Sequence, residues 1–262
     1  LSEFNTPIVS PLTSKEINLN KNIFQSIPPV ELQRELMFRH VDSLILQDPD
    51  PCVMIIYDTS TENVKEELLK RFPYAELIDT DLTMGLVDPE ITDSLLVEQK
   101  NNLVFLESQN LNVITSVSSL LNSQISKERN INMLSSYRSE TYENENISFQ
   151  HLGNLKFTYP TYFYPKYDEE LNELNDLFFE NFGKLPNKIV IRAYEITLDL
   201  ILRSAFRRKL VKSINIGETK YYQNRFKYKK LNNGYINESV LLIQHDDLDV
   251  FEITSEKWFP NQ

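Results

Sequence analysis

Hydrophobic residues along the middle of the chain alternate between short continuous runs and longer stretches with helical spacing. The continuous runs at 52–57, 103–106 and 131–134 are typical of strands buried on both faces of a parallel sheet. Between them, apolar residues recur three and four positions apart, as over 31–47, which is typical of amphipathic helices. This alternation predicts an α/β fold, with the strand 52–57 near the centre of its sheet.

Short polar motifs indicate where several helices begin and end. Thr59 and Glu62 fit a capping box, in which the hydroxyl caps the first turn and the glutamate reaches back. Asp88–Pro89 fits a cap followed by proline at the first helical position. Asp168 is expected to cap a helix that closes at Gly183.

The pattern changes after the fifth expected strand, at 155–159. The segment 159–165 is extended, aromatic and punctuated by proline, which suits a crossing between two lobes. A helix over 188–209 is apolar on most faces, which predicts that it is packed between other elements. After Gly217 the apolar period changes to two, which predicts β-strands at the C-terminus.

The chain begins with one short strand and a hydroxyl-rich loop over 6–14. A lone strand at a terminus cannot pair its backbone on both sides, so we expect this chain to be the later part of a larger α/β protein. The apolar faces of the strand at 8–9 and of the helices at 168–183 and 188–209 are then expected to be exposed, exchanged with a second copy, or covered by a partner chain.

Composition excludes some classes of function. A net charge of −11 argues against nucleic acid as the main partner, because phosphate binding needs a basic face. No apolar run approaches the roughly 20 residues that span a bilayer, and no signal peptide is visible. Cys52 is the only cysteine, so the chain holds no internal disulfide and no cysteine-based metal site.

Sequence signals for catalysis are poor. His40, His151 and His245 lie on distant elements, and none belongs to a pair with metal-ligand spacing. The five glycines are never within three residues of one another, which excludes a glycine-rich phosphate loop. We therefore predict a protein that is not an enzyme and that uses no cofactor or metal.

The order of elements resembles the type I periplasmic-binding-protein family, the fold of bacterial amino-acid receptors. The residues that carry this resemblance are Val9–Ser14 and Phe24–Pro28 at a first crossing, and Phe182–Asn187 followed by Arg192–Asp199. The chain is most similar to a divergent branch found in Gram-negative envelope proteins that carry a peptidoglycan-binding LysM module upstream. By this comparison, the first half of lobe one is missing here.

The resemblance implies an α/β protein with two lobes, each a parallel sheet flanked by helices, and with β-strands at the C-terminus. Residues 1–28 and 160–216 would form a partial lobe one, and residues 29–159 and 217–262 would form lobe two. The third crossing between the lobes is expected near Gly217.

The resemblance also places ligand-binding residues. Ser10, Thr13 and Ser14 match the loop whose hydroxyls grip the ligand's carboxylate and ammonium in that family, and hydroxyls both donate and accept. The alternative is that these hydroxyls form turns and cap the following segment. Tyr159 and Tyr162 would line the cleft, or would serve as hydrophobic anchors of the crossing segment.

A second group follows the fourth strand, at the carboxyl edge where α/β proteins bind ligands. There Tyr137 would contact ligand and Arg138 would pair with a carboxylate, unless the arginine forms a surface ion pair. Two departures from the family weaken the expected binding. Thr61-Glu62-Asn63 stands near the usual Tyr-Gly pair, and Glu107-Ser108 replaces glycines after the third strand.

Together these features predict a non-enzymatic, receptor-like module of the periplasm or cell envelope. It would bind an amino-acid-like or cell-wall-derived small molecule, weakly in this chain alone. The alternative is an envelope protein-interaction scaffold that has lost small-ligand binding. Partners through the missing N-terminal region would be peptidoglycan or an envelope protein, and the fragment is expected to self-associate.

Overall fold

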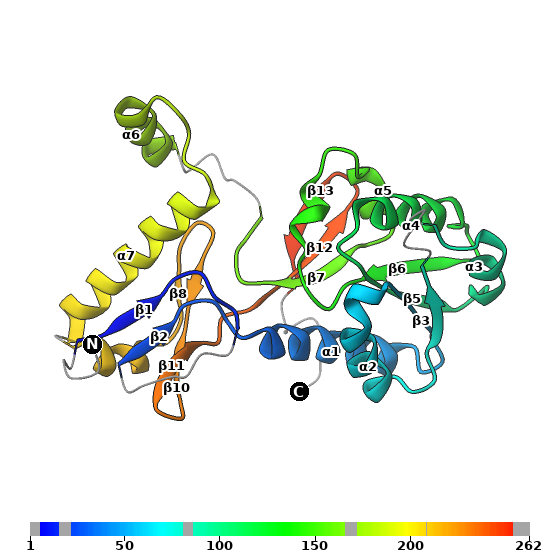
Figure 1. Cartoon of the computed structure of the whole chain (residues 1–262), viewed down its shortest axis with the longest axis horizontal. Helices are drawn as coiled ribbons and strands as arrows, with labels where there is room; N and C mark the ends of the chain where they lie inside the picture. The colour runs from blue at the N-terminus through cyan, green and yellow to red at the C-terminus, as the bar shows by residue number, and fades with distance from the viewer. Residues whose placement is uncertain (1–5, 16–21, 81–85, 166–171, 208, 254–262) are drawn as a thin grey trace. The chain divides into compact units, whose positions relative to one another are not determined.

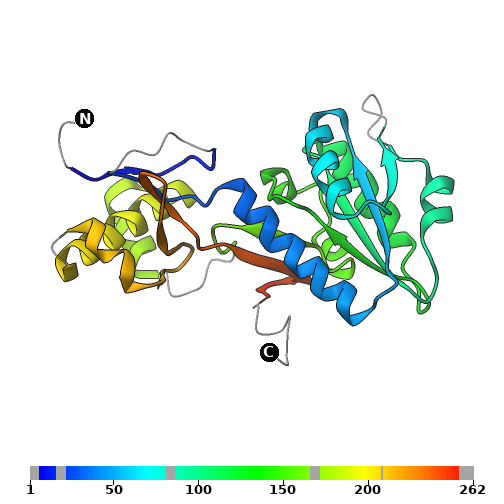
Figure 2. The same cartoon turned by 90° about the horizontal axis from the view of Figure 1, so that it is seen from below.

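The computed structural model describes residues 6–15, 22–80, 86–165, 172–207 and 209–253. The chain divides into two compact units, each formed by two separate stretches of sequence (Figures 1 and 2). Unit 1 comprises Leu1–Gln33 and Thr161–Leu241, and unit 2 comprises Arg34–Pro160 and Leu242–Gln262. The expected cap Asp168 lies outside the described residues.

Unit 2 contains a seven-stranded sheet in the order β13-β12-β7-β6-β5-β3-β4. Its strands β4, β3, β5, β6 and β7 run parallel, as the continuous apolar runs predicted, and β12 and β13 form an antiparallel hairpin. The strands are β3 Cys52–Tyr57, β4 Glu76–Asp79, β5 Asn101–Glu107, β6 Asn130–Leu134, β7 Thr158–Thr161, β12 Leu241–Asp246 and β13 Asp249–Glu252.

Helices cover both faces of this sheet (Figure 1). On one face, Met37 and Val41 of α1 and Leu68 of α2 pack with Val53 and Phe105 of the sheet. On the other side of unit 2 lie α4 and α5, and α4 buries Val113, Ile114, Val117 and Leu121. The helices are α1 Val30–Gln47, α2 Glu62–Arg71, α3 Pro89–Leu95, α4 Leu111–Ser123 and α5 Phe149–Asn154, with 3-10 turns η1 Thr59–Thr61 and η2 Glu140–Glu143.

Two local expectations for unit 2 are corrected. Strand β3 is buried from Val53 to Ile56, but it is second from the edge of the sheet, because β4 adds outside it. The capping box is displaced by one residue: Asp58 accepts a hydrogen bond from Ser60 N at 2.8 Å, and Thr61 reaches back to Asp58 N at 3.2 Å. Asp58 caps the 3-10 turn because its carboxylate lies directly after the end of β3, where the turn starts. Asp88, by contrast, caps α3 as predicted.

Unit 1 contains a four-stranded sheet in the order β1-β2-β11-β10, in which β1, β2 and β11 are parallel. Its core stacks Phe24 on Tyr235, with ring centroids 4.3 Å apart, and adds Phe226 and Tyr228. The elements are β1 Ile8–Ser10, β2 Ile23–Gln25, β8 Thr219–Lys220, β9 Arg225–Phe226, β10 Tyr228–Leu231, β11 Gly234–Asn237, α6 Asn172–Phe182, α7 Lys188–Arg207 and the 3-10 segment η4 Leu210–Ile216.

The expected assignment of residues 217–241 to the second lobe is corrected. These residues belong to unit 1, because β11 pairs in parallel with β2, so that Tyr235 lies opposite Phe24. The chain enters unit 2 for the last time at 241–242 rather than near Gly217.

Helix α7 also differs from its prediction. We expected it to be packed between other elements, but Ile201, Leu202 and Phe206 are 60%, 52% and 70% exposed. Large apolar residues of α6 and α7 are exposed, as expected for these two helices, whereas Ile8 and Val9 of β1 are half-buried. The inward face of α7 carries four charged residues beside Ile191 and Ile196, and Arg192 on this face contacts the site described next.

Candidate functional site

The carboxyl end of β1 carries the three hydroxyl residues predicted to bind ligand. Ser10, Thr13 and Ser14 are all half-buried in the loop that follows the strand. The side-chain amide of Gln25, at the end of β2, donates to Thr13 O at 3.0 Å and to Lys15 O at 3.2 Å. This amide therefore fixes the loop through the main-chain carbonyls of Thr13 and Lys15.

The turn-forming alternative is realised for one of these hydroxyls. Thr13 Oγ1 accepts a hydrogen bond from Lys15 N at 3.2 Å, which is a local turn contact. A hydroxyl that accepts still has its own O–H to donate. The turn contact and ligand contact are therefore compatible at Thr13.

A buried arginine from α7 fixes the same loop. Arg192 Nε donates to Pro11 O at 2.9 Å, and its Nη2 donates to Ser26 Oγ, also at 2.9 Å. Ser26 Oγ in turn donates to Ser10 O at 2.9 Å, and Arg192 Nη1 donates to Asn224 Oδ1. The guanidinium thus ties the end of β1, the end of β2 and the loop before β9 into one rigid arrangement.

Within the described part of the chain, Arg192 forms no direct ion pair. Its hydrogen-bond acceptors among the described residues are a carbonyl, a hydroxyl and an amide, all uncharged. Burial lowers the pKa of this guanidinium, while the nearby Tyr162, Tyr228 and Glu195 raise it. Glu195 itself binds Asn224 N at 2.9 Å and Asn224 Nδ2 at 2.7 Å, so it orients the amide that receives Arg192.

Tyr162 belongs to this arrangement as well. The Arg192 guanidinium lies 5.0 Å from the centre of the Tyr162 ring, a cation–π distance. Arg192, which the sequence analysis did not select, therefore contacts the Tyr162 ring directly and the Ser10 carbonyl through Ser26. The Thr13 carbonyl is held by Gln25 instead.

In unit 2, polar residues gather at the carboxyl ends of β3, β5 and β6. Asp58 follows β3 and accepts hydrogen bonds from Ser60 and from Ser108 Oγ. Glu107 ends β5, and its main-chain carbonyl accepts from Thr61 Oγ1 at 2.6 Å. Ser136 follows β6 and donates its backbone N–H to Glu107 Oε1 at 2.7 Å.

Glu107 is the most perturbed group of this edge. It is completely buried, and burial raises the pKa of its carboxyl group to about 8, although the Ser136 contacts act in the opposite direction. Its Oε2 has no hydrogen-bond partner among the described residues, and Ser136 Oγ lies beside the carboxyl without a well-aligned bond. At neutral pH the group is therefore mostly protonated and able to donate.

The predicted residues of unit 2 occupy different environments. Arg138 forms an ion pair with Glu143, as the alternative reading expected. Tyr137 is half-buried next to Glu107, and burial together with the charge of Glu107 raises the pKa of its phenol. Tyr159 is 5% exposed and lies with its ring 5.1 Å from Phe157, so its side chain packs in the core.

The site residues that sequence reasoning missed are Gln25, Arg192, Asp58 and Glu107. For two of them, Glu107 and Arg192, the sequence contains a pattern that could have identified them. Glu107 is an acidic residue at the carboxyl end of a continuous apolar strand, and Arg192 starts a polar series with Glu195, Asp199 and Arg203 at spacings of three, four and four. Such a series lies on one face of a helix.

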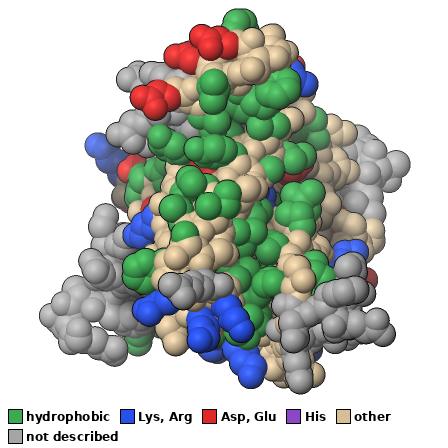
Figure 3. Space-filling model, turned by 90° about the vertical axis from the view of Figure 1, so that its left-hand side faces the viewer, with side chains coloured by type: hydrophobic (Ala, Val, Ile, Leu, Met, Phe, Trp, Pro, Cys, Tyr) green, Lys and Arg blue, Asp and Glu red, His purple; other side chains and the backbone are tan. Residues whose placement is uncertain are grey.

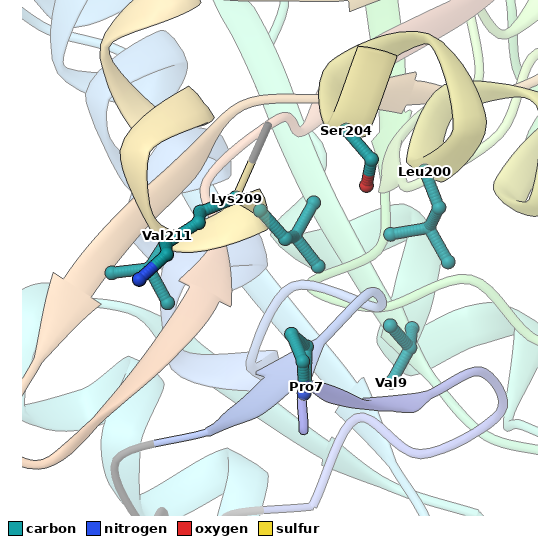
Figure 4. A pocket seen from close by; sticks show the side chains of 7 residues that line it. Pro7, Val9, Leu200, Ser204, Lys209 and Val211 are labelled. Atoms are coloured by element: carbon teal, nitrogen blue, oxygen red, sulfur yellow. The ribbon is translucent and has the colours of Figure 1, made fainter. Parts of the chain in front are cut away.

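Two cavities are formed by described residues within single units, and neither is lined by the seven predicted site residues. A cavity of about 440 Å³ in unit 1 has side chains of β1, α7 and η4 facing one another across it (Figure 4). Its wall is apolar apart from Ser204 and Lys209. A cavity of about 360 Å³ in unit 2 is lined by polar uncharged groups, including Ser43, Asn132 and Gln244, together with Phe251.

Within the residues that the structure describes, no three histidine, cysteine, aspartate or glutamate residues are grouped so as to hold a metal ion. No described helix is long and apolar enough to cross a bilayer.

This chain is similar to known proteins in its three-dimensional structure. No family model matches the chain, and no curated protein matches it in sequence. A branched-chain amino acid ABC transporter periplasmic ligand-binding protein from Burkholderia xenovorans superposes with a TM-score of 0.58 at 10% identity, over 92% of this chain and 68% of that one. This chain has the fold of a type I periplasmic binding protein. The resemblance predicted from the sequence is thereby confirmed for the fold.

Two other solved structures have lower scores. A fatty acid ABC transporter substrate-binding protein from Thermomonospora curvata gives a TM-score of 0.48 at 12% identity, over 94% of this chain and 68% of that one. A leucine-, isoleucine-, valine-, threonine- and alanine-binding protein from Brucella ovis gives 0.49 at 11% identity, over 90% of this chain and 65% of that one.

Proposed function

We propose that this protein is a non-enzymatic small-molecule-binding module of the periplasm or cell envelope, and that ligand contacts the hydroxyl loop of unit 1. One observation carries the proposal. The loop with Ser10, Thr13 and Ser14 is held through its main-chain carbonyls by Gln25, Ser26 and Arg192, and these contacts do not use the three hydroxyls. Pre-organised donors of this kind cost little entropy when a ligand binds.

The charge behind the loop favours a ligand that carries a carboxylate. Arg192 contributes a buried positive charge whose described hydrogen-bond acceptors are all neutral, and the nearby Glu195 carboxylate offsets part of this charge. The remaining charge attracts an anionic group at the loop. Hydroxyl donors from Ser10, Thr13 and Ser14 are suited to a carboxylate as well. An amino acid or a short cell-wall-derived peptide has this group.

Unit 2 offers a second set of groups, proposed separately. Glu107 Oε2 and Ser136 Oγ are buried polar atoms at the carboxyl edge of a parallel sheet, which is where α/β folds bind ligands. Tyr137 lies next to them, and Arg138 is held by Glu143. We propose that Tyr137 contacts ligand and that Arg138 positions this loop.

A thermal-shift screen against free amino acids and short cell-wall peptides tests the proposal. A ligand at ten times its Kd adds about 1.4 kcal/mol of stability, which is measurable as a rise in Tm. The shift is expected to disappear in a Thr13→Ala, Ser14→Ala double variant. It is expected to persist in Ser123→Ala, which removes an exposed hydroxyl from α4 in unit 2. A shift that survives the double substitution would place the site elsewhere.

The scaffold alternative is supported by a different observation, the exposed apolar face on α6 and α7. A monomeric protein rarely leaves a large apolar patch in water unless the patch binds something. On this alternative, no amino acid or cell-wall peptide shifts the Tm, and partner binding is lost when the apolar face is substituted. Cell fractionation of the native host, with antibody to this chain, tests the proposed envelope location.

A further inference from the structure

Helix α7 buries charged residues beside Ile191 and Ile196 and leaves large apolar residues exposed, unlike an ordinary surface helix. Its face toward the unit 1 core carries four charged residues that are all at most 5% exposed: Arg192, Glu195, Asp199 and Arg203. Its face toward solvent carries large apolar side chains. A helix normally turns its apolar stripe inward, so this outward stripe requires an explanation.

Two of the inward charges, those of Asp199 and Arg203, are already engaged with each other and with neighbouring groups of unit 1. Arg203 Nε donates to Asp199 Oδ2 at 2.7 Å, and its other nitrogens donate to Phe226 O at 2.7 Å and Ser213 O at 3.1 Å. Asp199 Oδ1 accepts from Thr219 Oγ1 at 2.6 Å. The helix is therefore fixed in this orientation by buried charges, and it cannot rotate its apolar stripe inward.

The outward stripe has the spacing of a helix-packing seam. Tyr194, Leu198, Ile201 and Ala205 follow one another at intervals of four, three and four residues. Over 20 residues α7 is about 30 Å long, and the stripe continues through the turn into α6. Its exposed large members are Tyr194, Ile201 and Leu202 on α7 and Leu177, Phe179, Phe182 and Leu185 on α6 and the following turn. Ile189 and Phe206 are exposed as well, but each lies more than about 100° around the helix axis from the stripe.

Charges of opposite sign flank the two ends of this apolar face. Figure 3 shows a field of hydrophobic side chains with carboxylates at one end and lysine and arginine at the other. At the α6 end the exposed acids are Glu173, Asp176 and Glu180, with Lys184 in the following turn. At the end of α7 the exposed bases are Arg207, Lys209 and Lys212.

We propose that this α6–α7 face binds the same face of a second copy of the chain, with the two α7 helices antiparallel about a two-fold axis. A two-fold interface requires a self-complementary surface. Antiparallel pairing supplies it, because the acidic end of each copy meets the basic end of the other while the apolar stripes cover each other. A parallel pairing would set acid against acid and base against base.

The oligomeric state tests the interface. We expect size-exclusion chromatography with light scattering to show a dimer. Sedimentation at concentrations from 1 to 100 µM, about the range in which such dimers dissociate, is expected to show it as well. Ile201→Glu places a charge in the seam and is expected to weaken the dimer about 100-fold or more. The control Leu46→Glu changes an even more exposed apolar residue on α1, 73% against 60% for Ile201, and is expected to leave the dimer intact. Circular dichroism confirms that both variants are folded.

Disulfide trapping tests the direction of pairing. In a Cys52→Ser background, Tyr194→Cys mixed with Ala205→Cys is expected to give a crosslinked heterodimer, because the two ends of the seam meet only when the helices are antiparallel. Ala205→Cys alone is expected to remain uncrosslinked, as is Leu248→Cys in unit 2. A monomer at every concentration, irregular aggregates, a dimer that survives Ile201→Glu, or crosslinking of Ala205→Cys with itself would each overturn the proposal.

Discussion

Single buried charges decide much of the stability of unit 1. Asp199 and Arg203 are each about 1% exposed and bind each other within a network of carbonyl and hydroxyl groups. Removing one member of such a pair leaves the other charge buried without compensation. By contrast, the exposed pair of Glu35 and Arg39 is largely solvated, at 47% and 64% exposure.

Asp199→Ala is therefore expected to destabilise the protein by about 3–5 kcal/mol, because the Arg203 guanidinium loses its carboxylate in the core. Glu35→Ala, the control, is expected to change stability by less than about 1 kcal/mol. Urea unfolding followed by fluorescence measures both. Similar effects for the two variants would show that the buried pair contributes no more than a surface pair. An Asp199→Leu, Arg203→Met double variant is expected to recover much of the loss.

Glu107 gives unit 2 a pH-dependent contribution to stability. Burial raises its folded pKa from 4.5 to about 8, so the folded state holds a proton that the unfolded state releases. The contribution is fully present below pH 4.5 and is lost as pH rises toward 8. Glu107→Gln keeps the shape and the neutral form at every pH.

We expect Glu107→Gln to match the wild type near pH 4.5 and to exceed it at pH 8 by more than about 1 kcal/mol, since one pKa unit corresponds to about 1.4 kcal/mol. Chemical unfolding at pH 4.5, 6 and 8 measures the difference between the two proteins. A constant difference across this range would mean that Glu107 titrates normally. The comparison between variants cancels the contributions of other titrating groups.

At the scale of elements, the strand-to-helix turns carry the polar groups of unit 2. Asp58 is 1% exposed and caps the turn after β3, and it also binds Ser108 Oγ after β5. Asp88 makes the corresponding cap of α3 at the surface, with Glu90 N at 2.9 Å. The two aspartates perform the same capping role with very different burial.

Asp58→Ala is expected to cost more than the roughly 1 kcal/mol of an ordinary cap, because Ser108 and Ser60 lose their acceptor in a buried place. Asp88→Ala is expected to cost about 1 kcal/mol. Thermal unfolding of the two variants gives the comparison directly. Equal losses would indicate that the Asp58 contacts to the neighbouring strand end add nothing to the cap.

At the scale of the whole molecule, each unit is assembled from segments far apart in sequence. Unit 1 joins the N-terminal β1 and β2 to β11 and α7, and the hydrogen bond from Arg192 to Pro11 spans 181 positions. Unit 2 adds the C-terminal hairpin β12–β13 to a sheet formed by the middle of the chain. Both the proposed ligand loop and the proposed dimer face depend on these distant contacts.

The amino-acid sequence alone was enough for the elements and the fold class. Apolar runs such as 52–57 and 103–106 specify buried strands, and helical spacing specifies the helices between them, because both signals depend on neighbours a few residues away. The same order of elements gave the resemblance to type I periplasmic binding proteins. The hydroxyl loop at Ser10 to Ser14 was also found in this way, as a polar segment after a short strand.

Only the tertiary structure decided which side of α7 faces inward and which charges are buried together. Sequence pattern assigns apolar residues to the interior, but Arg192, Asp199 and Arg203 are interior because carbonyl and hydroxyl groups from distant segments bind them, and because Asp199 and Arg203 pair with each other. The pairing of β11 with β2, and with it the boundary at 241–242, likewise depends on backbone contacts between segments about 200 positions apart. No local pattern carries that information, because strand pairing and charge burial are properties of the assembled unit.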